Sequence, residues 1–479
     1  MPTYLDLFAG AGGFSLGLRA AGFDCVGVVE IDSRAADTYR MNFPDHVLEA
    51  PFVRLGREEG DARDIEPRVV GDVLRRQAVG EGELDLLVAG PPCQGFSHIG
   101  RSKLDSLARQ RGAFEHDERN QLYLRVTNML PVLRPRCFLI ENVPGILTHA
   151  RVNVAERIAE TAEGAGYRVA VTILNAAWYG VPQTRERVFI LGYREDLGLE
   201  PTFPPSKLSA TLTPGHLAGA RSVASLFVDE TRFITLDNPE PDRPRAVSVV
   251  EALGDLPAFT RHLEDGYRAG RVANRPLDYA GDPVPRTYDE AMRSWPGLPQ
   301  PDLVRDHYVR RTPRDYETFR RMQPGDRYPA AERIARQRYV EEILSYRSVR
   351  NILGGSARPR RKDFVPPYST GSFDEKWRKL IPDLPSWTVT AHLSKDGYSH
   401  IHYDSDQARS ITPREAARLQ SFPDAFAFAG NMGDAFRQVG NAVPPILARE
   451  LGRHIAATLD STGNADHPDR IIPVPVPIA

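Results

Sequence analysis

Residues 3–14 have the sequence TYLDLFAGAGGF, and this stretch decides the fold. It is an apolar run of strand character that ends in a glycine-rich turn, and a helical pattern follows over residues 13–21. Glycines in such a turn let the backbone approach a ligand closely, and the N-terminus of the next helix favours a carboxylate or phosphate. A dinucleotide fingerprint would need glycine at position 15, which is Ser15, so the stretch does not favour NAD.

The alternation of apolar strands and helical patterns continues to about residue 195. We expect strands at residues 3–8, 25–30, 84–89, 137–141, 169–174 and 188–193, and helices at residues 13–21, 120–133 and 154–162. The pattern predicts an α/β fold with an open, mostly parallel sheet. Ligands of such sheets bind at the carboxyl ends of the strands, so the residues that follow each strand are the functional candidates.

The regular pattern stops after residue 195. Residues 201–407 are rich in Pro, Gly and Arg, which predicts a second, smaller, irregular domain. A helix is expected to start at Pro413, capped by Thr412, and another to cover residues 445–459. We therefore divide the chain into residues 1–195, 196–408, 409–462 (with the last helix returning to the first domain) and a disordered tail, 463–479.

Composition narrows the class of protein. The chain has 479 residues, of which 41% are hydrophobic and 26% charged, and no apolar run is long enough to span a membrane, so we expect a soluble cytoplasmic protein. Its three cysteines are too few and too scattered for a disulfide framework or a structural zinc site. Cys25 and Cys137 fit buried thiols in apolar strands. The net charge of −2 leaves room for a local basic surface.

Two side chains stand out at the predicted strand ends. Glu30 closes the second strand, where a carboxylate can accept hydrogen bonds from ribose hydroxyls. Cys93 follows the third strand inside the sequence GPPCQGFS, residues 90–97. Two prolines fix the backbone before this cysteine and Gly95 keeps the next turn open, so the thiol is a candidate nucleophile.

Acidic and basic side chains follow two further strands. Glu141 ends a buried apolar strand, where partial desolvation favours the protonated form that can donate a proton. Arg185 and Arg187 enter another strand two residues apart, so we expect them to point the same way. Each could instead be a paired structural charge.

Together these motifs resemble the cytosine-5 DNA methyltransferases. The resemblance covers residues 3–195 and 409–457 and includes residues 6–13, Glu30, 90–94, 141–143, 183–187, 409–423 and 440–445, in the family's order and spacing. It implies an S-adenosylmethionine-dependent methyltransferase with a Rossmann-like sheet and a target-recognition domain. The cofactor-binding positions it implies are Phe8, Gly10, Gly12, Glu30, Pro91, Asn441 and Val443, with an acid that contacts the adenine at Asp61 or, equally well, Asp64.

The implied mechanism agrees with the residue chemistry. Cys93 adds to carbon 6 of cytosine, Glu141 holds ring nitrogen 3 and the amine, Arg187 contacts the base oxygen and Arg185 helps to fix the site. The base must leave the duplex to be reached, and the polar loop at residues 97–118 is expected to close over the DNA. The base that removes the carbon 5 proton stays unassigned.

Two rival functions need separation from this one. Methylation of RNA is disfavoured, because the tRNA-methylating relatives carry a Cys-Phe-Thr motif and a short middle segment, whereas residues 137–139 here are Cys-Phe-Leu and the middle exceeds 200 residues. A non-catalytic DNA-binding protein is disfavoured because every catalytic position holds the expected residue type.

The middle segment is the candidate DNA-reading part. Residues 305–362 hold 16 Lys and Arg against 7 Asp and Glu, interleaved with tyrosines, so we expect phosphate contacts together with a few contacts to base edges. The expected partner is double-stranded DNA. A monomer is expected, with a cognate restriction endonuclease or a phage-defence system as its genetic context.

Overall fold

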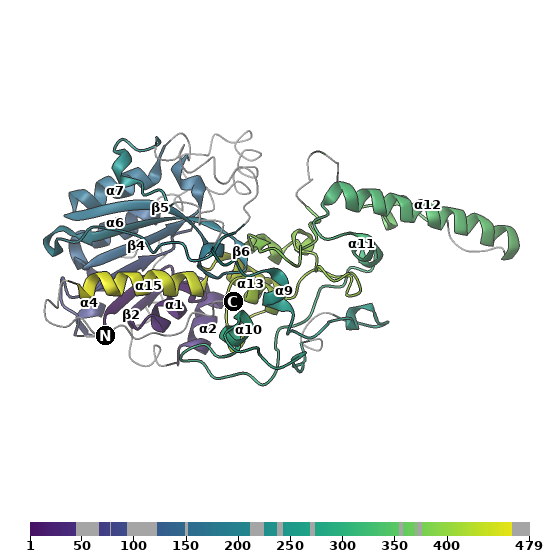
Figure 1. Ribbon diagram of the computed structural model, residues 1–479, viewed down its shortest axis with the longest axis horizontal. Coiled ribbons are helices and arrows are strands. Elements are labelled where there is room, and N and C mark those ends of the chain that lie inside the picture. Colours follow the sequence, from purple (N-terminus) through teal and green to yellow (C-terminus); the bar gives the residue numbers. More distant parts are fainter. Residues whose placement is uncertain are drawn as a thin grey trace.

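The computed structural model describes residues 1–44, 67–76, 78–92, 122–148, 152–210, 225–236, 243–268, 274–353, 358–368, 371 and 376–461 (Figure 1). All six predicted strands are present. They are β1 (Thr3–Leu7), β2 (Asp24–Val29), β3 (Leu86–Ala89), β4 (Cys137–Asn142), β5 (Tyr167–Asn175) and β7 (Glu186–Arg194). The predicted tail, residues 463–479, lies outside the described residues.

The strands form one sheet in the order β2-β1-β3-β4-β7-β5. β1 to β4 pair in parallel, whereas β7 is antiparallel to both β4 and β5. The expectation of an open, mostly parallel α/β sheet is therefore confirmed, with β7 as the one reversed strand of this sheet. A second sheet contains only β6 (Gln183–Thr184) and β8 (Ser386–Trp387).

Alternate residues of the strands pack on opposite faces of the sheet, because successive side chains of a strand point in opposite directions. In β3, Leu86 and Val88 belong to one hydrophobic core, and Leu87 and Ala89 to another. The first core contains α1 (Gly13–Ala20), α2 (Ser33–Asn42) and α15 (Pro445–Asp460), and the second contains α4 (Pro67–Arg76), α6 (Leu122–Leu133) and α7 (Val154–Gly164). The sheet is thus a layer covered on both faces (Figure 1).

The middle segment is largely irregular, as expected, but it contains one long helix that the sequence reading missed. Its helices are α9 (Val249–Leu253), α10 (Tyr288–Arg293), α11 (Tyr316–Arg321) and α12 (Tyr328–Leu353). The 26 residues of α12 extend away from the rest of the molecule (Figure 1). Polar residues surround much of this helix, so its apolar period was too weak to predict it.

The middle segment also shares the first core with the sheet. Val249, Met292, Trp295 and Val304 are buried together with residues of β1, α1 and α15. The domain boundaries at residues 195 and 408 stay predictions, and the shared core shows that part of the middle segment packs directly on the sheet-bearing part.

The helices after residue 409 begin as predicted. Thr412 caps α13 (Pro413–Leu419): its hydroxyl accepts from the Glu415 backbone N–H, and the Glu415 carboxylate accepts from the Thr412 backbone N–H. Pro413 is the first helical residue. α14 (Met432–Asn441) follows and leads directly into α15.

Short 3-10 helices complete the chain at Pro144–Leu147, Ala176–Tyr179, Glu195–Leu197, Glu230–Arg232, Arg261–Leu263, Arg361–Asp363, Ala391–Ser394 and Gly397–Ser399. Within the described ranges, none of the helices has the length and apolar character needed to cross a lipid bilayer.

A buried hub of polar side chains joins four separate parts of the sequence. Arg185 donates from Nη1 to the Val389 carbonyl (2.9 Å) and from Nη2 to the Gly440 (3.2 Å) and Ala442 (3.1 Å) carbonyls. Gln183 donates to the Leu419 carbonyl (2.7 Å) and accepts from the Val389 backbone N–H (3.0 Å). The hub fixes α14 and the start of α15 against the sheet.

A polar chain also crosses the first core beneath the glycine turn. Ser15 Oγ donates to Asp6 Oδ2 (2.8 Å) and accepts from the Tyr39 hydroxyl (3.1 Å), and all three residues are fully buried. Asp6 Oδ1 has no hydrogen-bond partner among the described residues. The pKa of Asp6 is raised to about 7, mainly by burial; the Ser15 hydrogen bond opposes this rise and the nearby Glu30 carboxylate adds to it.

The pKa of Asp6 makes stability depend on pH. Because the folded value lies above the 3.8 of an ordinary aspartate, the folded protein holds this proton more tightly than the unfolded chain. The stabilisation is complete below about pH 4 and is lost as the pH rises to about 7.

Relative to Asp6→Asn, wild type should lose about 1.4 kcal/mol of unfolding free energy per pH unit between about pH 4 and pH 7, measured by urea unfolding. Asp24→Asn, which changes an exposed carboxyl of β2, should show no such trend, and a pH-independent difference for Asp6→Asn would contradict the assignment.

The hub requires glycine at position 440. A Cβ there would lie 2.1 Å from the Ala391 backbone nitrogen and 2.2 Å from the Thr390 carbonyl carbon. Gly440→Ala should therefore lower the free energy of unfolding by about 1–3 kcal/mol, because backbone atoms must move apart. Gly164→Ala at the end of α7 is the control, since a Cβ there meets nothing within 4 Å. Equal stability of the two variants in chemical denaturation would show that this close approach is absent in solution.

Candidate active site at the carboxyl edge of the sheet

The turn after β1 has an unusual backbone. Phe8, Gly10 and Gly12 have φ angles of 61°, 58° and 94°, so three residues of this short turn are left-handed. Such a φ is uncommon for an aromatic residue, which makes Phe8 a strained position. A Cβ on Gly10 would meet nothing within 4 Å, so the backbone of this residue faces open space. The turn therefore offers a place where a ligand can approach the main chain closely.

The next two glycines serve packing instead. A Cβ on Gly12 would lie 2.7 Å from the Phe43 ring, and one on Gly13 would lie 2.3 Å from the Val443 carbonyl oxygen. Val443 is buried, whereas Asn441, the last residue of α14, is exposed. The structure thus brings residues 442–443 against Gly13, directly after the turn that follows β1, although more than 400 residues separate them in sequence.

Glu30 links the end of β2 to the same turn. Its Oε2 accepts from the Gly10 backbone N–H (2.7 Å) and its Oε1 accepts from the Asp32 backbone N–H (2.6 Å). Burial raises the pKa of Glu30, and the two backbone donors oppose this rise. Each carboxylate oxygen has a further lone pair that could accept from a ligand hydroxyl.

Glu141 and Arg187 form an ion pair at the ends of β4 and β7. Arg187 Nε lies 3.0 Å from Glu141 Oε1, and only 12% and 11% of the two side chains are exposed. A Cβ on Gly90 would lie 4.0 Å from Glu141 Oε2, so the second carboxylate oxygen faces the turn after β3. The pair presents a carboxylate and a guanidinium side by side at the sheet edge.

The neighbouring backbone is held by Asn142. Its Nδ2 donates to the Pro91 carbonyl (3.3 Å), while the Gly90 N–H donates to the Leu7 carbonyl (3.3 Å). Pro91 is therefore fixed between β1 and β4. Cys93, Asp61, Asp64 and the proposed closing loop lie outside the described residues, so their predicted roles stay predictions.

The expectation that Arg185 and Arg187 point the same way is wrong. β6 ends at Thr184 and β7 begins at Glu186, so Arg185 lies between two strands rather than within one. Its side chain is 2% exposed and donates to the three carbonyls of the hub, whereas Arg187 turns to Glu141. The geometry makes Arg185 a positioning residue and leaves Arg187 as the cation of the site.

Sequence reasoning also missed the polar support of the site. Asp6 and Ser15 were read only as parts of the glycine motif, but they form the buried pair below it. An aspartate inside an otherwise apolar strand was the available signal. Gln183 and Gln420, which contact each other in the hub, carried no signal that distinguished them from surface glutamines.

The arrangement combines three chemical features along one edge. The open turn lies beside the Glu30 carboxylate, which is held by two backbone N–H groups, and together they could hold a hydroxylated ligand such as a nucleoside. Beside it, Glu141 and Arg187 could bind a polar planar ring, since a carboxylate and a guanidinium together match its acceptor and donor atoms. The turn after β3 runs through Pro92 directly into the sequence position of Cys93.

Comparison with known proteins identifies the family. The model of the C-5 cytosine-specific DNA methylase family matches residues 3–238 and 305–457. A candidate type II methyltransferase of Oceanobacillus iheyensis is 34% identical over 461 residues, which covers 94% of each chain. The type II methyltransferase M.AgeI of Thalassovita gelatinovora is 32% identical over 475 residues and covers 95% of this chain and 99% of its own.

Solved structures support the same fold. The crystal structure of a candidate DNA modification methyltransferase encoded within a prophage (E. coli) superposes with a TM-score of 0.60 at 22% identity, covering 96% of this chain and all of the other. This confirms the predicted methyltransferase fold. The chain belongs to the C-5 cytosine-specific DNA methylase family and is a DNA (cytosine-5)-methyltransferase.

Proposed function

We propose that this enzyme transfers a methyl group from S-adenosyl-L-methionine to carbon 5 of a flipped-out cytosine, with Cys93 as nucleophile and with Glu141 and Arg187 holding the base. The observation that carries the proposal is the largely buried Glu141–Arg187 pair, whose second carboxylate oxygen faces the turn after β3, which precedes Cys93 in the sequence. Cys93 follows β3 in the sequence, and the base-binding groups Glu141 and Arg187 belong to the next two strands of the sheet, β4 and β7.

The residues at the first turn fit an adenosine-containing cofactor. Gly10 faces open space beside the Glu30 carboxylate, which can accept from ribose hydroxyls while its backbone hydrogen bonds keep it in place. Phe8 and Gly12 belong to this turn, and Val443 packs against Gly13 directly after it. Pro91 and Asn441 are further proposed cofactor positions, and Asp61 or Asp64 would supply the contact to the adenine. When bound, S-adenosyl-L-methionine supplies an electrophilic methyl group on a sulfonium centre.

The residues of this chain prepare the cytosine for that transfer. The Cys93 thiolate adds to carbon 6, which breaks the aromaticity of the ring and makes carbon 5 nucleophilic. Glu141 Oε2 holds the proton on ring nitrogen 3, and Arg187 donates to the base oxygen, so both groups stabilise the charge that develops on the ring. Loss of the carbon 5 proton and elimination of Cys93 then restore the thiolate. Arg185 acts only by holding the surrounding segments.

The middle segment is the proposed reader of the DNA sequence. Residues 196–408 contain the basic stretch from Arg305 to Lys362 and the projecting helix α12. Arg333 and Arg347 are exposed on that helix, where they can contact phosphates, whereas contacts to base edges would specify the target. The relatives named as type II methyltransferases support a restriction-modification context. The cognate endonuclease would be encoded elsewhere. We also propose that the enzyme is a monomer.

Covalent catalysis predicts that the enzyme can be trapped on its substrate. In target DNA that carries fluorine instead of hydrogen at carbon 5 of cytosine, no proton can leave carbon 5 after methyl transfer. Elimination of Cys93 therefore stops, and a denaturation-resistant adduct should form when cofactor is present. Cys93→Ala should abolish the adduct, whereas Cys25→Ala should leave it undiminished. An undiminished adduct in Cys93→Ala would remove this residue as nucleophile. RNA of the same sequence should give no adduct if DNA is the substrate.

The proposed role of Glu30 predicts that its substitution weakens cofactor binding and leaves DNA affinity unchanged. Glu30→Ala should weaken binding of S-adenosylhomocysteine by about 1.5–3 kcal/mol, the usual contribution of a charged hydrogen bond, as measured by calorimetry. Glu30→Gln, which keeps the shape and loses the charge, should lie between wild type and alanine. Glu160→Gln, on the exposed face of α7, is the matched control. Unchanged affinity in Glu30→Ala would contradict the cofactor assignment.

A further inference from the structure

A cavity lies between α15 and the middle segment. Its volume is about 650 Å³, within the range of about 300–1,000 Å³ typical of small-molecule sites. One wall is α15, through Ile446, Arg449 and Glu450, and the opposite walls come from residues 244–251 and 286–296. None of the residues that we assign to the cofactor or to catalysis lines it.

Most of the cavity surface is apolar. Trp295, which is 2% exposed, belongs to the first hydrophobic core and also lines the cavity, together with Val247, Ala291 and Ile446. Tyr179, from the 3-10 helix after β5, adds a second aromatic side chain. These walls suit the apolar body of a small molecule, which would pack against the aromatic surface that Trp295 and Tyr179 leave open to the cavity.

The charged groups of the cavity have an excess of cations. Four cationic side chains line it against three carboxylates: Lys207, Arg245, Arg286 and Arg449, and Glu251, Glu290 and Glu450. Most of the carboxylate charge is already neutralised. Glu450 contacts Lys207 and lies 3.6 Å from Arg449 and 3.5 Å from Arg453, which is outside the lining, and Glu251 pairs with Arg245 at 3.1 Å.

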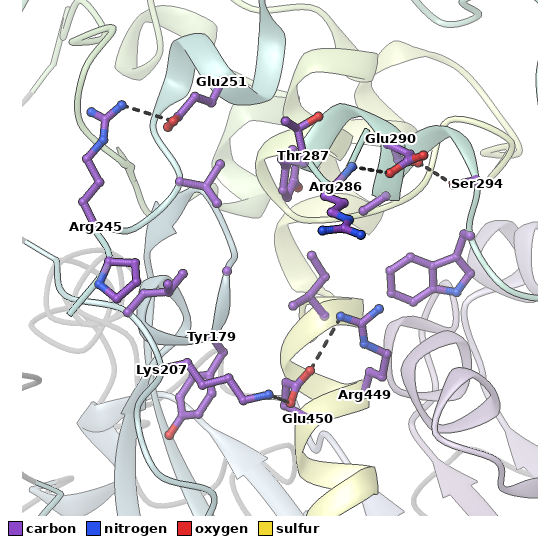
Figure 2. Close-up of a pocket in the computed structure, with 18 of the residues that line it drawn as sticks. Tyr179, Lys207, Arg245, Glu251, Arg286, Thr287, Glu290, Ser294, Arg449 and Glu450 are labelled. Atoms are coloured by element: carbon purple, nitrogen blue, oxygen red, sulfur yellow. Dashed lines mark hydrogen bonds and ion pairs between the residues drawn. The ribbon is translucent and has the colours of Figure 1, made fainter. Parts of the chain in front are cut away.

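Two guanidinium groups are placed to meet a ligand. Figure 2 shows the Arg286 side chain descending from the α10 side and the Arg449 side chain rising from α15, both toward the interior. The Glu290 carboxylate accepts from the backbone N–H of Arg286, and no ion pair of the Arg286 guanidinium occurs within the part of the chain that the structure describes. Arg449 lies over the Trp295 ring at 5.2 Å, and burial lowers its pKa.

We propose that this cavity is a second ligand site, which binds a small planar organic anion: an aromatic ring that carries a carboxylate, sulfonate or phosphate group. The ring would lie among Trp295, Ile446 and Tyr179, and the anionic group would bind Arg286 and Arg449. A neutral ring would leave the Arg286 guanidinium without an anionic partner among the described residues, and a simple anion would leave the apolar walls exposed to water. The inference goes beyond the proposed methyl transfer, because it uses none of its residues.

The first test uses the fluorescent probe 8-anilinonaphthalene-1-sulfonate with the full-length chain. We expect saturable binding that Arg286→Gln weakens at least about tenfold, as the loss of a charged hydrogen bond predicts. Ala291→Phe, which fills the cavity, should abolish it. Arg453→Gln, which removes a cation of α15 outside the cavity lining, should bind the probe like wild type. Equal binding by wild type, Arg286→Gln and Ala291→Phe would overturn the proposal.

Competition separates this site from the cofactor site and tests the ligand class. Saturating S-adenosylhomocysteine should leave the bound probe in place, and displacement by it would overturn the assignment. Indole-3-acetate should displace the probe, whereas tryptamine, which has the same ring with a positive charge, should not. Equal displacement by both compounds would show that the cavity does not select anions. Methyl transfer by Arg286→Gln reports on the proposed function separately, since this residue lies outside the catalytic machinery.

Discussion

The Arg185 guanidinium, bonded to carbonyl oxygens of Val389, Gly440 and Ala442, is the constraint on which the site depends. A buried cation is costly unless it is hydrogen-bonded, and here carbonyls from two remote segments accept from both terminal nitrogens of the guanidinium. The end of α14 is thereby held so that the Val443 carbonyl packs against Gly13. Tyr39 of α2 packs against Gly12 at the end of the turn after β1, and residues 442–443 pack against Gly13, while Gly10 stays open.

The reversed strand β7 explains how a carboxylate and a guanidinium meet at the edge. In an antiparallel pair the start of one strand lies beside the end of its neighbour, and Asn142 of β4 is in register with Val188 of β7. Arg187, just before that residue, therefore reaches Glu141 at the end of β4. A parallel strand in this position would have placed Arg187 at the opposite edge, away from the ligand-binding ends of the other strands.

Buried ion pairs hold the segment after residue 409 together, and one of them, Arg418–Asp255, joins it to the middle segment. Arg418 binds both Asp424 (2.6 Å) and Asp255 (2.9 Å), and Arg409 binds Glu415 (2.6 Å), with all the arginine side chains fully buried. The Arg409 guanidinium holds the pKa of Glu415 well below its usual range despite burial. Such pairs fix one geometry, because separating either partner would leave an unpaired charge in the core. The motif at residues 409–423 thus acts as a structural joint between the sheet and the middle segment.

The sequence alone determined the six strands, the helices that begin at residues 13, 413 and 445, and the family, because strand periodicity, capping residues and short motifs are local features of the chain. It also placed Glu30 and Glu141 at the sheet edge, since both directly follow apolar strands. Only the tertiary structure decided that Arg185 is buried and hydrogen-bonded to remote carbonyls, whereas Arg187 is the cation beside Glu141 at the candidate site. It also decided that Asp6 and Ser15 form a buried pair, that α12 projects, and that a cavity lies between α15 and the middle segment. These features depend on contacts between residues far apart in the chain, and the orientation of a side chain toward such a partner leaves no local pattern in a single sequence.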